Sequence, residues 1–223
     1  GRPAEPGLRA DALAVFDHVR QERAEIAVMG RSLGSGVAVQ LANTRPVERL
    51  VLVTAYDSLV NVAREYFRWL PVGLLLRDRY ESATRANEVE APVLIVIAGD
   101  DEIISRARSE ALAAAFTQGQ VQIEVVPGVG HNTLDASPAY LEAVRDAAAA
   151  LRGRFMLALG GEHTLTYGLV RGIAESPENL TIVHVDAHAD LIDRLHGQPW
   201  SHGTVMRRLH EKGRKGEVSL LLD

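Results

Sequence analysis

The feature that most constrains the fold of this chain is a regular alternation of short apolar runs with stretches of helical period. The apolar runs are nearly continuous, which is typical of strands buried on both faces of a parallel sheet. They occupy residues 25–29, 49–54, 92–98, 121–126, 154–159, 180–186 and 217–222. Helices are expected at about 8–22, 35–44, 58–69, 105–117, 137–151, 164–175 and 203–213. The pattern predicts an α/β fold with mostly parallel strands and helices on both faces, a three-layer α/β/α arrangement.

Charge and hydropathy narrow the classes of partner. The net charge of −5 gives no basic footprint for nucleic acid, so we expect a small-molecule substrate and leave a homo-oligomer open. No apolar run reaches the roughly 20 residues of a membrane span, and no membrane partner is expected. Residues 67–76, "FRWLPVGLLL", contain Arg68 and Pro71, which favours a buried or lid-like segment. The absence of cysteine fits a reducing compartment, and the expected location is the cytoplasm.

The stretch Gly30-Arg31-Ser32-Leu33-Gly34 has the pattern G-x-S-x-G directly after an expected strand and before an expected helix. This is the context of a nucleophile elbow, in which a tight turn holds the serine hydroxyl above the sheet. A glycine-rich turn with an idle serine is the alternative. The pattern alone is weak, and its partners must decide between the two.

Two further chain segments supply those partners. The strand expected at 92–98 ends in "AGDDEII", and the one at 121–126 ends in "PGVGHNTL". An acid and then a histidine, each after its own strand, give the order Ser…Asp…His of a hydrolytic triad. The sequence thus predicts Ser32 as nucleophile and His131 as base, with Asp101 as the acid and Asp100 as the alternative.

Residues 1–151 resemble an α/β-hydrolase of the compact serine-hydrolase type without a large cap. The match is carried by "GRSLGSGVA", "DDEII" and "PGVGHNTL". The resemblance implies an oxyanion hole formed in part by the backbone N–H of Leu33, and no cofactor. The resemblance also implies that a loop from strands preceding the elbow supplies the other donor, and no such strands are expected among residues 1–24. The strand expected at 25–29 would then be an exposed apolar edge.

A second constellation follows residue 152. "LALGGEHTLTYG" and "IVHVDAHADL" each follow an expected strand. Asp186, His188 and Asp190 are spaced by two, so in extended chain they point the same way, and His163 could add a fourth donor from the neighbouring strand. Mixed imidazole and carboxylate donors suit Mn²⁺, Zn²⁺ or Fe²⁺, with carboxylate-rich sets favouring Mn²⁺.

Residues 154–222 resemble the ureohydrolase family, nearer agmatinase than arginase. The match is carried by "LGGEHTLTYGLVRGI", "VDAHADL" and "SHGTVMRRL". The resemblance implies a binuclear Mn²⁺ site with His163, Asp186, His188 and Asp190 among its ligands, and His202 as a catalytic histidine. His196 is a weaker candidate. Two more aspartate ligands of the family lie beyond the end of this chain, so the site is expected to be incomplete.

The composition changes near residue 152. Six of the eight histidines and both lysines follow this point, while residues 1–151 carry the whole net charge. We therefore expect a partial α/β-hydrolase domain at 1–151 and a partial agmatinase-like segment at 152–223, with both chain ends cutting through a domain. The second part is too short to bury a core alone, and the first leaves the apolar edge of the strand at 25–29 exposed, which predicts that the two dock extensively.

Three interpretations remain at this stage. The first is serine-dependent hydrolysis of a small ester or amide. The second is a manganese-dependent amidinohydrolase that releases urea from a guanidino compound. The third is a non-catalytic composite of two hydrolase fragments. The first keeps its whole triad and is preferred.

Overall fold

The structure is a computed structural model that describes residues 4–117, 119–134, 137–149, 155–160, 163–173, 182–186, 190–212 and 218–222. The chain forms two compact units. The first holds residues 1–131 and 153–161, and the second holds residues 132–152 and 162–223. The boundary predicted at 151/152 falls outside the described residues, and as a seam between two sequence segments it stays a prediction.

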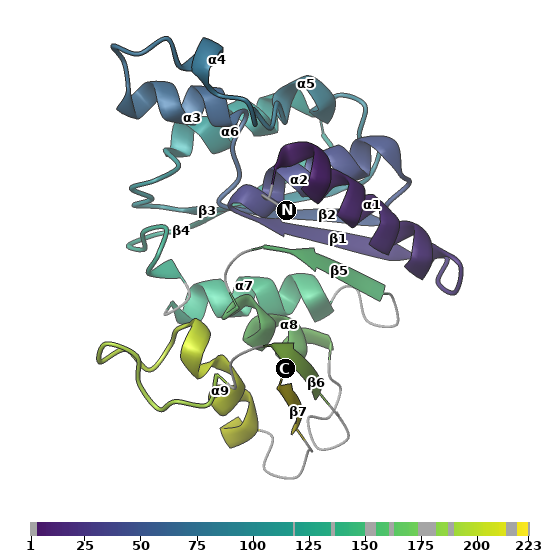
Figure 1. The fold of residues 1–223 in the computed structure, drawn as a ribbon, viewed down its shortest axis with the longest axis vertical. Coiled ribbons are helices and arrows are strands. Elements are labelled where there is room, and N and C mark those ends of the chain that lie inside the picture. Colours follow the sequence, from purple (N-terminus) through teal and green to yellow (C-terminus); the bar gives the residue numbers. More distant parts are fainter. Residues whose placement is uncertain are drawn as a thin grey trace. The chain divides into compact units, whose positions relative to one another are not determined.

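The first unit is built on a five-stranded parallel sheet with the order β4-β3-β2-β1-β5 (Figure 1). Its strands are β1 (Ile26–Arg31), β2 (Arg49–Val53), β3 (Val93–Ala98), β4 (Val121–Val126) and β5 (Phe155–Leu159). Every residue of β1 and β3 is buried, as their unbroken apolar sequences require. The predicted α/β class with parallel strands is confirmed.

Six helices of the first unit are described. They are α1 (Glu5–Arg20), α2 (Leu33–Thr44), α3 (Leu59–Tyr66), α4 (Val72–Leu75), α5 (Ala83–Ala86) and α6 (Arg106–Ala115). Figure 1 shows α1 beside α2, and α2 against β1 and β2. One turn apart on α1, Ala12 and Phe16 enter the core of the unit, which also contains the apolar side chains of the strands.

The strand β5 pairs in parallel with the elbow strand β1, from Ile26 opposite Phe155 to Gly30 opposite Leu159. The pairing confirms that a strand from beyond residue 152 covers the edge of β1. An apolar strand without such a neighbour would expose a row of unpaired backbone groups. β5 therefore completes the sheet at the strand that carries the serine.

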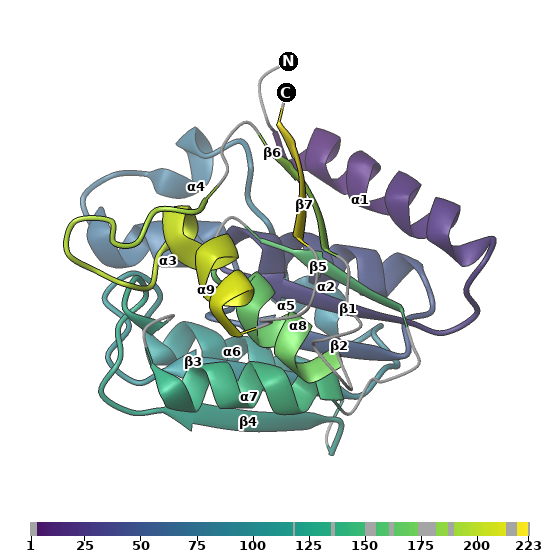
Figure 2. The ribbon, with the colours of Figure 1, turned by 90° about the horizontal axis from the view of Figure 1, so that it is seen from below.

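The second unit contains α7 (Pro138–Ala149), α8 (Leu165–Ile173), the short helix η3 (His202–Thr204) and α9 (Val205–Lys212). A parallel pair, β6 (Ile182–Asp186) and β7 (Val218–Leu222), forms its sheet. Figures 1 and 2 show α7 and α8 side by side. Their backbones approach closely at Gly172, where an added Cβ would lie 2.4 Å from the carbonyl oxygen of Arg145 and 2.5 Å from Ala148 Cβ.

Residues 67–76 depart from expectation, because most of their apolar side chains face solvent. Val72 is buried, but Trp69 is 80% exposed and Leu74 is 85% exposed. Of the two interpretations, the buried segment is therefore wrong, and the lid-like segment stays a prediction. None of the described helices is both long enough and apolar enough to cross a bilayer.

Candidate active site

The serine, histidine and acid predicted from the sequence lie in contact at the carboxyl ends of β1, β3 and β4. Ser32 Oγ is 3.0 Å from His131 Nε2. His131 Nδ1 is 2.9 Å from Asp101 Oδ2 and 3.1 Å from Asp101 Oδ1. The histidine stands between the other two groups, and the three side chains form one continuous chain of contacts. This geometry can move a proton from the hydroxyl to the imidazole while the carboxylate holds the ring.

The backbone at Ser32 has the conformation of a tight turn. Its φ of 51° and ψ of −122° lie in a region that L-residues rarely adopt. The turn is held from both sides, since the Ser32 N–H donates to the Val53 carbonyl at 3.0 Å and the Ser35 hydroxyl donates to the Ser32 carbonyl at 2.6 Å. These two hydrogen bonds therefore hold the Ser32 backbone in its strained conformation.

Both glycines of the motif are required by close packing. A Cβ on Gly30 would lie 2.6 Å from Ala38 Cβ, and one on Gly34 would lie 2.2 Å from the carbonyl oxygen of Leu159. Because Gly30 has no side chain, α2 can pack closely on β1. Because Gly34 has none, the end of β5 can approach the start of α2. The spacing of the glycines thus follows from the turn and its neighbours.

The structure distinguishes the two candidate acids. Asp101 has a side chain that is 1% exposed, and its Oδ1 also accepts the N–H groups of Ile103 and Ile104 at 2.9 and 2.7 Å. Asp100 has an exposed side chain, and its backbone N–H donates to the Val129 carbonyl. The carboxylate that faces His131 is therefore that of Asp101.

Two residues that the sequence analysis did not single out hold the histidine loop. The buried Arg31 donates from Nη2 to the carbonyl of His131 at 3.3 Å. Glu102 Oε2 accepts the backbone N–H of His131 at 2.9 Å. A hydrogen bond from its own backbone amide, and then the one from His131, lowers the pKa of the Glu102 carboxyl. Arg31 occupies the variable position before the serine, and Glu102 follows the acid, so proximity to the motifs was the only available signal.

An apolar pocket of about 370 Å³ lies next to the elbow, within the first unit. Leu33 and Gly34, the two residues after Ser32, line it together with side chains of α1 and β5. The charged residue in its lining is Asp11, and the other members are apolar: Leu8, Ala12, Val15, Val37, Leu157, Leu159 and Gly160. The pocket suits a hydrocarbon group attached to a carbonyl placed at Ser32.

The end of β5 also reaches the elbow. Gly160 follows β5, and a Cβ built on it would lie 3.3 Å from Arg31 Cβ and 3.9 Å from the Arg31 nitrogen. The backbone of Gly160 therefore runs beside the residue that precedes the serine. The backbone N–H of Leu33, predicted as an oxyanion donor, belongs to the first residue of α2 on the other side of the serine.

The structure describes the side chains of two of the four predicted metal ligands. His163 Nδ1 lies 2.7 Å from Asp190 Oδ2, both in the second unit. His188 and the side chain of Asp186 lie outside the described residues. The described side chains contain no group of three or more metal-binding residues. The pair formed by His163 and Asp190 is therefore what the described part of the predicted site offers. Two donors do not fit a binuclear centre.

The remaining histidine candidates are also placed. His202 begins η3 in the second unit, and its side chain is exposed. His196 is exposed in the preceding loop with a φ of 49°. A role for either in catalysis stays a prediction.

Two protein families match this chain over different but overlapping ranges. Residues 6–156 match the dienelactone hydrolase family, and residues 99–220 match the arginase family. The chain belongs to both families. The two matches share residues 99–156, so they do not fix a boundary at one residue. The serine constellation lies within the dienelactone hydrolase match, and the His163–Asp190 pair lies within the arginase match.

Curated relatives support each family separately. An uncharacterized protein of Mycobacterium tuberculosis is 44% identical over 136 residues, which is 59% of this chain and 48% of that protein. An agmatinase of Bacillus anthracis is 35% identical over 82 residues, 37% of this chain and 27% of the agmatinase. The α/β-hydrolase domain-containing protein aho-3 of Caenorhabditis elegans is 28% identical over 65% of this chain and 43% of its own length. The chain spans at most about half the length of these relatives.

Solved structures show similar folds at low identity. MGS-MChE2, an α/β-hydrolase enzyme from a lagoon-sediment metagenome, is 16% identical with a TM-score of 0.48, over 61% of this chain and 67% of that one. A monoacylglycerol lipase of Paleococcus ferrophilus is 20% identical with a TM-score of 0.42, over 55% of this chain and 66% of that one.

Proposed function

We propose that the chain is a serine hydrolase that cleaves a small ester or amide through Ser32, His131 and Asp101. The observation that carries the proposal is the continuous contact from the Ser32 hydroxyl through the imidazole to the buried Asp101 carboxylate. His131 Nε2 takes the hydroxyl proton as Ser32 Oγ attacks the carbonyl carbon. The same nitrogen then gives the proton to the leaving group, and water attacks the acyl-enzyme by the reverse path.

The oxyanion of the tetrahedral intermediate needs backbone donors. Leu33 supplies one N–H at the start of α2. We propose the N–H of Gly160 as the second, because β5 ends beside the elbow and brings this residue next to Arg31. The second donor would thus come from the end of β5, the strand that pairs with β1. Two donors stabilise the developing charge far better than one.

The pocket beside Leu33 indicates the kind of substrate. Its lining is almost wholly apolar and its volume is about 370 Å³, which fits a short acyl or alkyl group. We therefore expect hydrolysis of p-nitrophenyl esters to improve from acetate to butyrate as added methylenes enter the pocket.

A fluorophosphonate probe tests the proposal directly. The wild-type chain should be labelled at Ser32, and Ser32→Ala should lose both labelling and esterase activity while keeping its melting temperature. Ser105→Ala is the matched control, because its hydroxyl donates to Glu65 and contacts neither Ser32 nor His131. A folded Ser32→Ala variant with undiminished esterase activity would refute the proposal.

A manganese-dependent amidinohydrolase is the second candidate, favoured by the arginase match and by the contact between His163 and Asp190. The described side chains supply two of the four predicted donors, fewer than two Mn²⁺ ions need. Metal content after dialysis against Mn²⁺ tests it, and two tightly bound ions per chain would support it. A chain with neither bound metal nor probe labelling, but with a cooperative melt, would be the non-catalytic composite.

A further inference from the structure

The most exposed apolar surface of the first unit lies between α3 and α5, away from the core. Five large side chains form it, and we call them the apolar patch: Tyr66, Phe67, Trp69, Leu74 and Leu75. Trp69, Leu74 and Leu75 are 80%, 85% and 64% exposed. Isolated apolar side chains are common on protein surfaces, but five exposed ones within residues 66–75 favour an interaction site.

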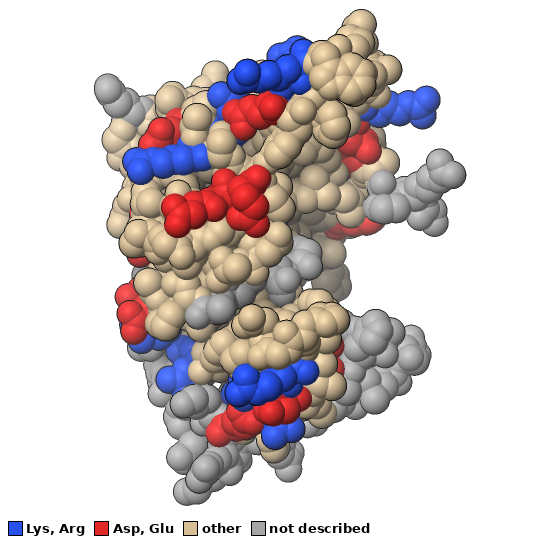
Figure 3. Space-filling view, turned by 90° about the vertical axis from the view of Figure 1, so that its left-hand side faces the viewer, with Lys and Arg blue, Asp and Glu red and all other residues tan. Residues whose placement is uncertain are grey.

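Arginines surround the patch. Arg64, Arg68, Arg77 and Arg79 are all exposed, although the chain as a whole carries a net charge of −5. Figure 3 shows blue side chains flanking the tan surface at the upper end of the view, where Figure 1 places α3 and α4.

Acidic groups of the same segment are partly engaged elsewhere. Glu65 pairs with Arg108 at 2.9 Å. Asp78 is half-buried and accepts the backbone N–H of Glu5 at 3.0 Å. Glu81 is half-buried and lines the same pocket as Arg64 and Arg79. Four exposed arginines and three carboxylates, two of them half-buried, leave a small positive excess in this segment.

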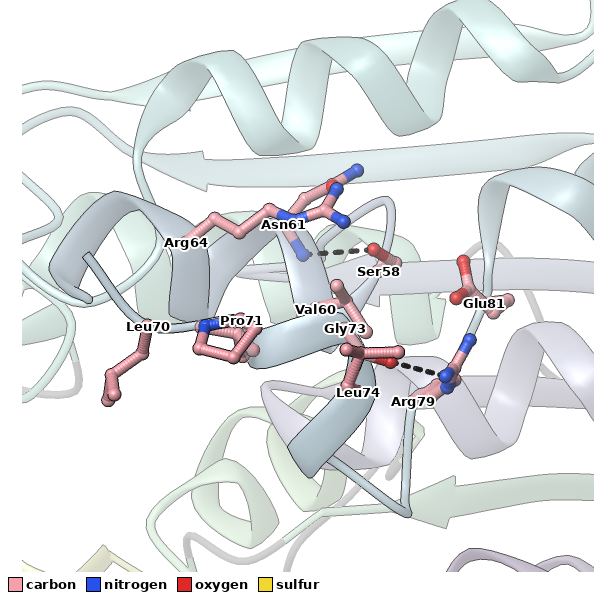
Figure 4. A pocket seen from close by; sticks show the side chains of 11 residues that line it. Ser58, Val60, Asn61, Arg64, Leu70, Pro71, Gly73, Leu74, Arg79 and Glu81 are labelled. Atoms are coloured by element: carbon pink, nitrogen blue, oxygen red, sulfur yellow. Dashed lines mark hydrogen bonds between the residues drawn. The ribbon is translucent and has the colours of Figure 1, made fainter. Parts of the chain in front are cut away.

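A pocket of about 480 Å³ opens between the patch and α3 (Figure 4). Arg64 and Arg79 line it together with the polar Ser58 and Asn61 and the carboxylate of Glu81, and Leu70 and Leu74 form its apolar side. Arg64 donates to Asn61 Oδ1 at 3.2 Å, and Arg79 donates to the Gly73 carbonyl. Each guanidinium has five N–H donors, so donors remain for an anion such as a phosphate.

The patch adjoins the proposed catalytic site. The Tyr66 hydroxyl donates to the carbonyls of Glu102 and Ile103, in the loop that carries Asp101. A surface bound to the patch would therefore lie next to the loop that supplies the acid.

We propose that residues 64–79 dock this protein on the surface of an anionic phospholipid bilayer. Trp69, Leu74 and Leu75 enter the interfacial layer, where aromatic and aliphatic side chains are stable, and the arginines contact lipid phosphates. A second copy of the chain is disfavoured as the occupant, because a self-complementary contact would bring the same arginines face to face. The proposal departs from the expectation of no membrane partner, which rested on the lack of a spanning segment. Surface docking needs no such segment, and it does not depend on the proposed catalysis.

Vesicle sedimentation with the full chain tests the proposal. Vesicles of phosphatidylcholine with about 30 mol% phosphatidylserine should bind the protein, pure phosphatidylcholine should bind it weakly, and binding should fall between about 0.1 M and about 0.5 M salt. In a Trp200→Phe background, the emission of Trp69 should shift to the blue on binding, because only two tryptophans are present.

Two double variants separate the contribution of the apolar side chains to membrane binding from that of the arginines. Leu74→Ser with Leu75→Ser, and separately Arg68→Gln with Arg77→Gln, should each lower the partition coefficient by about tenfold or more. Ile123→Ser and Arg23→Gln are the matched controls, since both residues are exposed on other elements, and they should leave binding unchanged. The proposal is overturned if the anionic vesicles do not bind. It is equally overturned if the patch variants bind like wild type, or if ultracentrifugation shows a dimer that the Leu74/Leu75 variant dissolves.

Discussion

At the scale of single residues, the site depends on which of two adjacent aspartates turns inward. Asp101 is held by two backbone N–H groups and faces His131, whereas Asp100 has an exposed side chain. Asp101→Asn should therefore lower kcat by about 10⁴-fold, because an amide cannot hold the imidazole in its working tautomer. Asp100→Asn should change kcat by less than about twofold, as for most surface substitutions. Steady-state kinetics on the two variants, with melting curves as a check on folding, distinguish them, and similar losses in both would contradict the assignment.

Glu102 makes the stability of the histidine loop depend on pH. Backbone hydrogen bonds lower its pKa in the folded chain below the ordinary value of 4.5. A lowered folded pKa stabilises the native state above the unfolded pKa, and this contribution is lost as the pH falls through the folded pKa. The melting temperature of wild type should exceed that of Glu102→Ala at neutral pH, and the difference should shrink as the pH falls below about 4.5.

The control for this experiment is Glu110→Ala, a carboxylate on α6 whose side chain pairs with Arg106 on the same helix. Its difference from wild type reports a surface ion pair that holds no loop in place. A Glu102→Ala difference that stayed constant from neutral to acid pH would show that the carboxylate charge has no role in the contact with His131.

The order of the triad residues could be predicted from the chain, but their supports could not. Ser32, Asp101 and His131 each follow an apolar strand, and the carboxyl ends of parallel strands meet at one edge of a sheet. The hydrogen bond from Arg31 to the His131 carbonyl joins residues that are 100 positions apart, and no local sequence pattern predicts it. Whether Asp186 and His188 join the pair formed by His163 and Asp190 stays a prediction.

At the scale of elements, all seven strands and the long helices were predicted within a few residues, since each has a clear period. The short α4 and α5 were missed because four residues cannot show a helical period. The exposed course of residues 67–76 was missed for a different reason. An apolar run predicts burial only if some other part of the chain covers it, and sequence alone does not reveal the cover.

The strand β5 brings Gly160 to the elbow, which leads to a prediction about its backbone. Gly160→Pro removes the N–H proposed as an oxyanion donor, and kcat should fall by about 10²-fold or more. Leu159, in an extended strand, tolerates a following proline. Gly160→Ala keeps the N–H and is the matched control, although its Cβ would approach Arg31 Cβ at 3.3 Å. Equal activity in the two variants, at equal melting temperature, would exclude this amide as a donor.

At the scale of the whole molecule, the two compact units do not follow the composition change near residue 152. β5 comes after that point and completes the sheet of the first unit, and α7 comes before it and packs against α8 in the second unit. The sequence predicts that the two segments dock, because the second is too short for a core and the first would expose the strand at 25–29. The exchange of elements could not be predicted, because it depends on pairing between strands of similar apolar character.

This exchange leads to a prediction about cutting the chain at the join. A protease recognition sequence placed between Arg152 and Gly153 should allow cleavage without separation, because β5 remains paired with β1 and α7 remains packed on α8. The cut protein should elute as one species and melt in one cooperative transition.

Residues 1–152 produced alone should aggregate, since β1 would lose the neighbour that pairs with Ile26 to Gly30 and α7 would lose its contact with α8. The uncut protein with the same insertion is the control for the insertion itself. If residues 1–152 instead formed a soluble, cooperatively melting piece that a fluorophosphonate labels at Ser32, then β5 would not be needed for the fold, and Gly160 could not be the second oxyanion donor.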